Sequence, residues 1–300
     1  RTGWPPGCCR RAGTAGRERR MILISVAILA GTGLVFAILI ALANQKLRVW
    51  EDPRIDQVTA MLPGANCGAC GLPGCRAFAE QAVGGKVNPA KCNVVTEVGL
   101  GQIASLLGVA AGQQEKRVAR LLCAGGNNVT VQQAEYRGLN TCAAAATVSG
   151  GGKACSWGCL SHGDCAVACT FGAIVMTDTG LPVVDPVLCT ACGDCVDACP
   201  KNLFVIQPLE QKLIVQCSNL VVSDDIRAIC LVACTACGKC VMDAESGLIS
   251  VASGVAVIDY SMNDVADTKA IARCPTGAIV WVDGAQTFDT HATMAGSTAQ

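Results

Sequence analysis

The sequence predicts an α+β protein made of small modules that follow one N-terminal transmembrane helix. Three observations support this fold class: an uncharged apolar run near the N-terminus, 22 cysteines that lie mostly in tight clusters, and short strand-like segments between those clusters. Aromatic residues make up only 4% of the 300 residues, and alanine, glycine and valine dominate. Such a chain cannot build large hydrophobic cores, so its modules should depend on covalent or metal links.

Residues 22–43 form the predicted transmembrane helix. They include no charged side chain and are long enough to cross a bilayer with some tilt. A buried core helix is the alternative, but the length of the unbroken apolar run disfavours it. Lys46 and Arg48 follow the run, and by the positive-inside rule they hold that end in the cytoplasm. We therefore expect a single-pass anchor over residues 21–45 in the inner (plasma) membrane, with the later modules on its cytoplasmic side.

Residues 1–20 differ in composition from the rest of the chain. They are basic, rich in glycine and proline, and end immediately before Met21, where the apolar run begins. We expect Met21 to be the true start and the preceding stretch, with its two cysteines, to be a non-native extension. The alternative is a twin-arginine export signal at Arg19 and Arg20 with cleavage after residues 41–43. The apolar run is much longer than the roughly 7–15-residue apolar region within a signal peptide, which disfavours export.

The fullest cysteine run has the spacing C-x2-C-x2-C-x3-C-P and consists of Cys189, Cys192, Cys195, Cys199 and Pro200. This is the spacing of bacterial ferredoxins, in which three thiolates bind one cubane cluster and the fourth reaches a second cluster. The run therefore predicts [4Fe–4S] clusters and an electron-transfer function.

Other uses of so many cysteines are less consistent with the spacing. Adjacent sulfurs of repeated C-x2-C-x2-C triads would compete for disulfide partners and strain the loops. A zinc ribbon does not need the third and fourth cysteines of such a run. His162 and His291 are the only histidines, which argues against a Rieske centre or a bis-histidine haem. His162 lies between two cysteines, and we expect it to be a solvated loop residue.

A two-cluster ferredoxin-like domain is predicted over residues 155–208. A second group of cysteines precedes the run above, and residues 172–184 between the two groups have the pattern of two short strands around a polar turn. The crossed ligation of ferredoxins assigns one cluster to Cys155, Cys159, Cys165 and Cys199. It assigns the other cluster to Cys169, Cys189, Cys192 and Cys195.

A separate 4Fe–4S loop domain is predicted over residues 46–105. Its cysteines have the spacing C-x2-C-x4-C-x16-C, with glycines between them that let the backbone fold closely around the sulfurs. A helix over residues 52–62 should precede the loop, because Asp52 can cap it and Pro53 suits its first position. The ligands predicted for this cluster are Cys67, Cys70, Cys75 and Cys92.

A second, degenerate ferredoxin-like domain is predicted over residues 209–283, because residues 189–195 recur as 234–240 and residues 169–176 recur as 274–281. Strands are expected near 248–251 and 255–258. Ala244 stands where the fourth cysteine of the run should be, and no triad precedes Cys274, so one cluster has been lost. The remaining cluster is assigned to Cys234, Cys237, Cys240 and Cys274.

Four cysteines remain without an assignment: Cys123, Cys142, Cys217 and Cys230. They flank the central domain in sequence, and the first two lie in a connector over residues 106–154. They could together bind a fifth cluster, they could be inert buried thiols, or they could exchange roles with Cys155 or Cys234. The sequence therefore predicts four [4Fe–4S] clusters and leaves a fifth open. Residues 284–300 are expected to form a disordered tail.

With its membrane anchor, the 66-NCGACGLPGC-75 block and the ferredoxin modules in this order, the chain resembles the long form of the B subunit of the Rnf complex. That complex is the ion-translocating ferredoxin:NAD+ oxidoreductase, and the resemblance covers residues 21–283. It implies that electrons from reduced soluble ferredoxin pass through this subunit towards NAD+, while the complex moves Na+ or H+. The lost ligands of the last module mean that the number of clusters cannot be copied from the family.

The resemblance also implies partner subunits, since this chain has no nucleotide motif of its own. It contains no G-x-G-x-x-G after a strand, and residues 150–153 lack the outer residues of a P-loop. NAD+, flavin and the ion path should therefore belong to other Rnf-type subunits, and the lipid bilayer is contacted through residues 22–43. A formal net charge of zero gives no reason to expect nucleic acid. Two other functions stay open: a polyferredoxin that donates electrons to a soluble enzyme such as nitrogenase, and an exported periplasmic ferredoxin.

Overall fold

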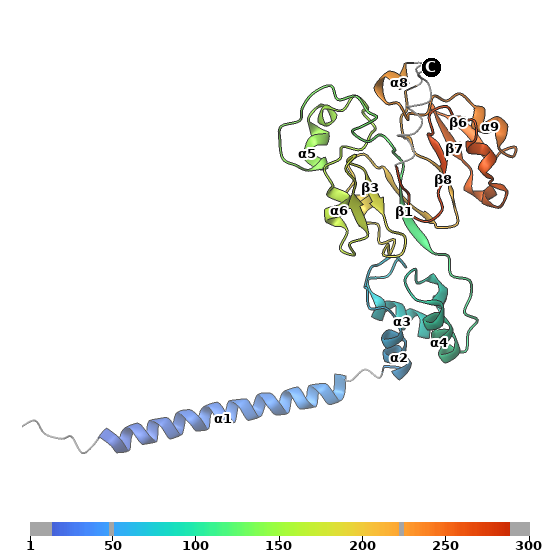
Figure 1. The fold of residues 1–300 in the computed structure, drawn as a ribbon. Coiled ribbons are helices and arrows are strands. Elements are labelled where there is room, and N and C mark those ends of the chain that lie inside the picture. Colours follow the sequence, from blue (N-terminus) through green and yellow to red (C-terminus); the bar gives the residue numbers. More distant parts are fainter. Residues whose placement is uncertain (1–13, 48–50, 222–224, 289–300) are drawn as a thin grey trace, which may run out of the picture. The chain divides into compact units, whose positions relative to one another are not determined.

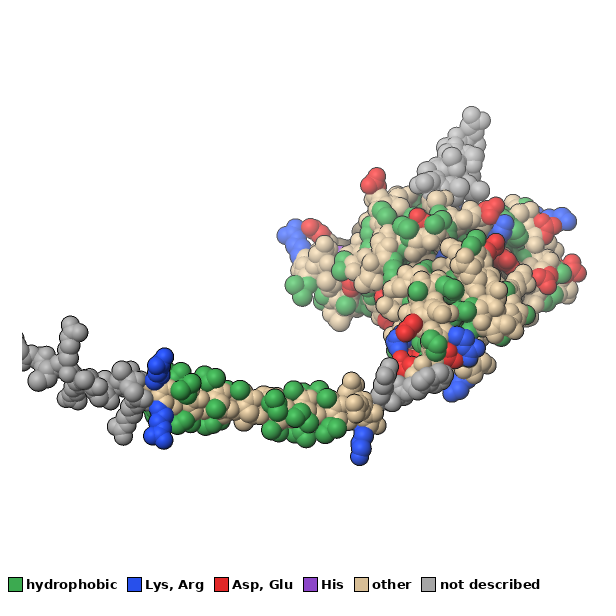
Figure 2. Space-filling model, turned by 90° about the horizontal axis from the view of Figure 1, so that it is seen from below, with side chains coloured by type: hydrophobic (Ala, Val, Ile, Leu, Met, Phe, Trp, Pro, Cys, Tyr) green, Lys and Arg blue, Asp and Glu red, His purple; other side chains and the backbone are tan. Residues whose placement is uncertain are grey.

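The computed structural model describes residues 14–47, 51–221 and 225–288, and the chain divides into two units at Asp52. The first unit is one helix, α1, over Thr14–Leu47. Its stretch Arg19–Leu47 has the length and composition of a membrane span, at 29 residues or about 43 Å, against roughly 30 Å of bilayer core. Figure 2 shows hydrophobic side chains along this helix and basic side chains at its two ends. The predicted N-terminal apolar helix is confirmed, and it begins before Met21. Residues 1–13 of the expected extension lie outside the described part.

The second unit starts with a small helical module that matches the predicted loop domain. The predicted helix is present as α2, Pro53–Met61, and Val58, Phe78 and Ile103 form a core in which each is at most 2% exposed. Its other elements are α3 Cys75–Val83, η1 Pro89–Lys91 and α4 Glu97–Leu107. Thr96 caps the start of α4, and Gly108 ends it in the left-handed conformation.

The central module combines one predicted hairpin with a strand pair that the sequence did not indicate. The hairpin pairs β2 Ile174–Met176 with β3 Pro182–Val184, as predicted. Strand β1, Arg117–Leu121, comes from the expected connector and pairs antiparallel with β4, Phe204–Pro208. The helices of this part are α5 Cys142–Thr147, η2 Ser149–Gly152, α6 Asp164–Ala168 and α7 Asp194–Asp197.

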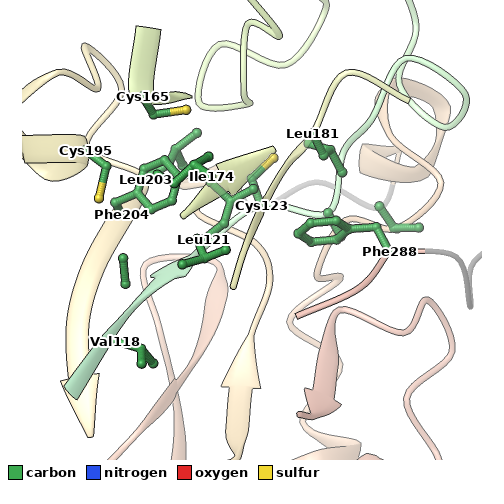
Figure 3. Packing of buried hydrophobic residues seen from close by; sticks show 14 of the residues in the cluster. Val118, Leu121, Cys123, Cys165, Ile174, Leu181, Cys195, Leu203, Phe204 and Phe288 are labelled. Atoms are coloured by element: carbon green, nitrogen blue, oxygen red, sulfur yellow. The ribbon is translucent and has the colours of Figure 1, made fainter. Parts of the chain in front are cut away.

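One buried cluster of side chains holds the central module together (Figure 3). Leu121, Ile174 and Leu203 are each at most 7% exposed and come from β1, β2 and the segment before β4. Cys165 on α6 and Cys195 on α7 belong to the same cluster. Two cysteine-bearing helices are therefore fixed on one shared core.

The last module repeats the arrangement of the central one (Figure 1). Its first strand, β5 Leu213–Val215, pairs antiparallel with its last, β8 Ile279–Trp281. Between them lies the hairpin of β6 Ile249–Ala252 and β7 Val255–Ile258, as predicted. The helices are α8 Ile226–Ile229, α9 Lys239–Asp243, η3 Tyr260–Val265 and η4 Thr268–Ile271.

The start of the predicted disordered tail is ordered, which corrects that expectation for residues 284–288. The Gln286 side chain accepts a hydrogen bond from the backbone N–H of Leu121 at 3.0 Å and donates one to its carbonyl at 2.7 Å. Arg120 donates to the carbonyl of Gly284 at 2.8 Å, and Phe288 is 6% exposed in the central core. The segment binds here because the outer edge of β1 presents buried backbone groups that need partners. Residues 289–300 lie outside the described part.

Candidate iron–sulfur sites

The first group of cysteines lines one pocket in the helical module. The pocket has an empty volume of about 350 Å³ and is lined by Cys67, Cys70, Cys75 and Cys92. Cys75 begins α3, and its backbone N–H donates to the Asn66 side chain at 2.8 Å. Gly68 and Gly71 have φ angles of 71° and 81°, which a residue with a side chain rarely adopts. Burial raises the pKa of Cys92, and the neighbouring thiols of Cys67 and Cys70 add to the rise.

A second pocket lies beside α7 in the central module. Its empty volume is about 320 Å³, and its cysteines are Cys169, Cys189, Cys192 and Cys195. The backbone N–H of Ala173 donates to the sulfur of Cys169 at 3.3 Å. Burial raises the pKa of Cys195 to about 12, and the other three thiols raise it in the same direction. The structure thus brings together the four cysteines that the crossed-ligation rule grouped.

A third pocket, of about 370 Å³, lies beside α9 in the last module and is lined by Cys234, Cys237, Cys240 and Cys274. This grouping also matches the sequence-based one. Cys237 is the exposed member. Although burial acts in the opposite direction, hydrogen bonds from the backbone of Lys239 and the side chain of Thr235 lower its pKa.

A fourth pocket of about 380 Å³ gathers cysteines from segments far apart in sequence: Cys123, Cys155, Cys217 and Cys230. The backbone N–H of Gly125 donates to the Cys123 sulfur at 3.4 Å, and the Thr130 hydroxyl contacts the Cys230 sulfur at 3.7 Å. Three of these cysteines belong to the set left unassigned by the sequence. The fourth is Cys155, which the spacing had grouped with Cys159, Cys165 and Cys199.

Cys142 instead lies with the thiols of Cys159, Cys165 and Cys199. Burial raises the pKa of Cys165 to about 12, and the thiols of Cys159, Cys142 and Cys199 raise it further. Burial also raises the pKa of the partly buried Cys159, and the thiols of Cys142 and Cys199 raise it in the same direction. The structure therefore places Cys142 with Cys159 and Cys165 and places Cys155 in the fourth pocket, an exchange that the sequence had left open.

The exchange has a local cause in two long-range contacts. The Asp164 carboxylate accepts hydrogen bonds from the backbone N–H groups of Cys142 and Ala143, at 2.8 and 3.0 Å, which fixes the start of α5 beside α6. Isolated β-bridges join Thr130 to Cys230 and Gln132 to Lys153. These bridges bring the segment before Cys155 next to Cys230. The spacing of cysteines in the sequence cannot predict either of these contacts.

The five sets suit a polynuclear cluster better than a single metal ion. All 20 cysteines of the described residues are free thiols, and four pockets are each lined by four of them. Backbone N–H groups also donate to cysteine sulfurs, as cluster-binding loops do: those of Gly125, Cys159, Ala173 and Leu203, at 3.3 to 3.5 Å.

Neighbouring sets of cysteines are joined through the residues around them. Next to Cys92, the Asn93 side chain donates to the carbonyl of Thr190 at 2.9 Å, which links the first set to the second. Cys165 and Cys195 share one core, which links the second set to that of Cys142. The next link joins two sets directly, because the backbone N–H of Cys159 donates to the Cys123 sulfur at 3.4 Å.

The last link joins Cys217 to the set of the last module. Burial raises the pKa of Cys217 to about 11, while a hydrogen bond from the backbone of Cys234 lowers it. Each of the five sets is thus joined to at least one other. His162 has no part in these contacts: its Nδ1 pairs with the Asn140 side chain at 2.8 Å, and its ring lies against Tyr136.

Comparisons with known families agree with these sites. Residues 62–94, which include the first set, match the family described as "Putative Fe-S cluster". Residues 182–204, which include Cys189 to Cys199, match the family described as "4Fe-4S binding domain". The chain is therefore an iron–sulfur protein with several cluster modules.

Three similar proteins identify its family. The B subunit of the Na(+)-translocating ferredoxin:NAD(+) oxidoreductase complex of Acetobacterium woodii is 44% identical over 239 residues, which is 80% of this chain and 72% of that protein. The B subunit of the proton-translocating ferredoxin:NAD(+) oxidoreductase complex of Clostridium ljungdahlii is 37% identical over 261 residues, 86% of this chain and 91% of that protein. The B subunit of the ion-translocating oxidoreductase complex of Methanosarcina acetivorans is 36% identical over 261 residues, 86% of this chain and 98% of that protein. The chain belongs to the family of the B subunit of the Rnf complex, an electron-transfer subunit, as the resemblance predicted.

Proposed function

We propose that this chain carries electrons from reduced soluble ferredoxin towards NAD+, as a membrane-anchored subunit whose partners translocate Na+ or H+. The names of the relatives support the donor, the acceptor and the coupling to ion movement. The observation that carries the proposal is that the cysteine sets are joined to one another, because electron transfer through a protein needs closely spaced redox centres. The flavin, NAD+ and ion sites belong to other subunits of the complex in this proposal.

Five [4Fe–4S] clusters, one for each four-cysteine set, are the proposed cofactors. When bound, each cluster supplies a one-electron redox centre. Two sets differ from the assignment made from spacing: one is Cys142, Cys159, Cys165 and Cys199, and the other is Cys123, Cys155, Cys217 and Cys230. The support for them is the fourth pocket, together with the proximity of the Cys142 thiol to those of Cys159 and Cys165. The other three sets keep the ligands given by spacing.

The order of the sets gives the proposed direction of the relay. The set of Cys67 stands at one end of the series, and the set of Cys234 stands at the other. Cys237 is the exposed cysteine of that last set, so we propose that soluble ferredoxin delivers electrons there. The module of Cys67 follows the membrane helix in sequence and would pass electrons to the membrane partners.

The membrane helix and its flanking charges support the proposed location. Helix α1 exposes every side chain described between Arg19 and Leu47, as expected of a helix surrounded by lipid. Lys46 near its C-terminal end favours a cytoplasmic position for that end. The cluster modules would then face the cytoplasm, where ferredoxin and NAD+ are found.

The test is to load the full chain with iron and sulfide under anaerobic conditions and to mix it with reduced ferredoxin in a stopped-flow spectrometer. The proposal expects four irons for each of the five sets and rapid reoxidation of ferredoxin. The control is a chain in which Cys237 is changed to Ser, which should slow the first electron transfer and leave the distant clusters loaded. Iron for only two clusters, or no reoxidation of ferredoxin by a fully loaded chain, would contradict the proposal.

A further inference from the structure

Lys153 is a buried lysine whose position the proposed relay does not explain. It is 5% exposed, and its Nζ donates to the carbonyl of Gly125 at 2.7 Å and to that of Cys159 at 2.7 Å. In the described part of the chain no carboxylate pairs with it. Burying an ammonium group without a negative partner carries the desolvation penalty of an ion. A favourable charge interaction elsewhere should offset this cost.

The two carbonyls belong to loops that hold different cysteine sets. Gly125 lies two residues after Cys123, and its own N–H donates to the Cys123 sulfur at 3.4 Å. Cys159 is a member of the other set, and its N–H donates to the same sulfur at 3.4 Å. The Lys153 ammonium therefore lies where the fourth pocket and the set of Cys142 meet.

The Lys153 ammonium lies beside both sets. Its Nζ donates to a backbone carbonyl in the loop of each set, and the two loops meet at the Cys123 sulfur. A cation in this position would stabilise the negative charge of clusters held in the two sets. A [4Fe–4S] cluster with four thiolates is anionic and gains one further negative charge on reduction, and net charge is one of the properties that set its potential.

We propose that Lys153 is a potential-setting residue shared by two clusters, that of Cys142 and that of Cys123, which we call the two middle clusters. Its buried charge holds both at a higher reduction potential than they would otherwise have. The step concerned is the arrival of one electron from the neighbouring reduced cluster, with no bond made or broken. The inference rests on the proposed assignment of clusters. Its consequence is that the middle of the relay accepts electrons readily from the ferredoxin end.

The test is an EPR-monitored redox titration of the loaded full chain and of the Lys153→Gln variant. Glutamine is neutral, and its amide can still donate to the two carbonyls, so the variant removes the charge more than the hydrogen bonds. At a fixed potential, we expect the ratio of reduced to oxidised cluster to drop by about tenfold for these two clusters. For a one-electron couple, this corresponds to a fall of about 59 mV in the midpoint potential. Their identity is checked by their loss in Cys142→Ala and in Cys217→Ala.

Two further variants act as controls. Lys153→Arg keeps the charge and should keep the midpoints. Lys201→Met removes a lysine that also donates to a carbonyl, that of Ser156 at 3.0 Å, but that is partly exposed. Its charge is screened by water, so its removal should move the midpoints much less.

The outcomes separate this inference from the proposed function. Unchanged midpoints in a fully loaded Lys153→Gln chain would overturn the inference and leave the relay intact. Loss of both middle clusters from Lys153→Gln, with retention in Lys153→Arg, would replace the redox role by a role in assembly and would also overturn it. A wild-type chain that lacks these two clusters would instead contradict the proposed assignment.

Discussion

Asp164 fixes Cys142 in its place, so its removal should loosen one cluster without removing any thiol. Its carboxylate accepts hydrogen bonds from the backbone N–H groups of Cys142 and Ala143, at 2.8 and 3.0 Å. Because this carboxylate is partly exposed to water, each bond is assigned about 1 kcal/mol, the typical net value for a hydrogen bond in a protein. Asp164→Ala should therefore destabilise the observed position of Cys142 by about 2 kcal/mol. This corresponds to roughly a 30-fold smaller fraction of molecules in which Cys142 is placed to bind the cluster.

The assay for this prediction is the rate of iron release from the loaded chain to a strong chelator, followed by absorbance and EPR. One cluster should be lost about 10- to 30-fold faster in Asp164→Ala, and the others should keep their wild-type rates. Asp178→Ala, in the exposed turn of the β2–β3 hairpin, is the control and should have no effect. An unchanged release rate in Asp164→Ala, or faster loss of the cluster that depends on Cys217, would refute the reasoning.

Three further predictions concern stability and the independence of the modules. Gln286→Ala should lower the free energy of unfolding by about 2–4 kcal/mol in chemical denaturation, because it leaves two buried backbone groups of Leu121 without partners. An unchanged midpoint of denaturation would show that the segment after β8 does not stabilise the fold. Cys75→Ala should remove the cluster of the helical module and leave the EPR signals of the others, and the loss of all signals would mean that the modules are not independent. The metal-free chain should lose stability as the pH rises from about 9 towards 12. Burial raises the pKa from 9.0 to about 12 for three thiols in the folded chain: Cys123, Cys165 and Cys195. Over this range the unfolded chain releases protons that the folded chain keeps, so unfolding becomes more favourable. Unfolding curves of the metal-free chain that do not change over this range would contradict that expectation.

The sequence predicted those parts of the fold whose signals are local. Helix α2 follows from its N-terminal proline and apolar spacing, and both hairpins follow from short apolar runs around polar turns. The β1–β4 and β5–β8 pairs were not predicted, since each joins strands of three to five residues that are more than 60 residues apart. The attachment of residues 284–288 was missed for the same reason, because the edge that Gln286 binds exists only after β1 has paired.

The same distinction applies to the cysteines. Spacing grouped three sets as they are found, because C-x2-C loops place their sulfurs around one centre whatever surrounds them. It left the roles of Cys142 and Cys155 open, because side chains remote in sequence decide which thiols meet there. The Asp164 carboxylate moves Cys142 to one set, and the bridge between Thr130 and Cys230 draws Cys155 to the other.

The most direct test of the five-cluster relay compares Cys142→Ala, Cys217→Ala and the double variant for iron, sulfide and EPR signals after anaerobic loading. The proposed ligand sets place these two cysteines on different clusters. We expect each single variant to lose one cluster, with a different signal missing in each, and the double variant to lose two. Loss of the same signal in both single variants, with no further loss in the double variant, would contradict the account.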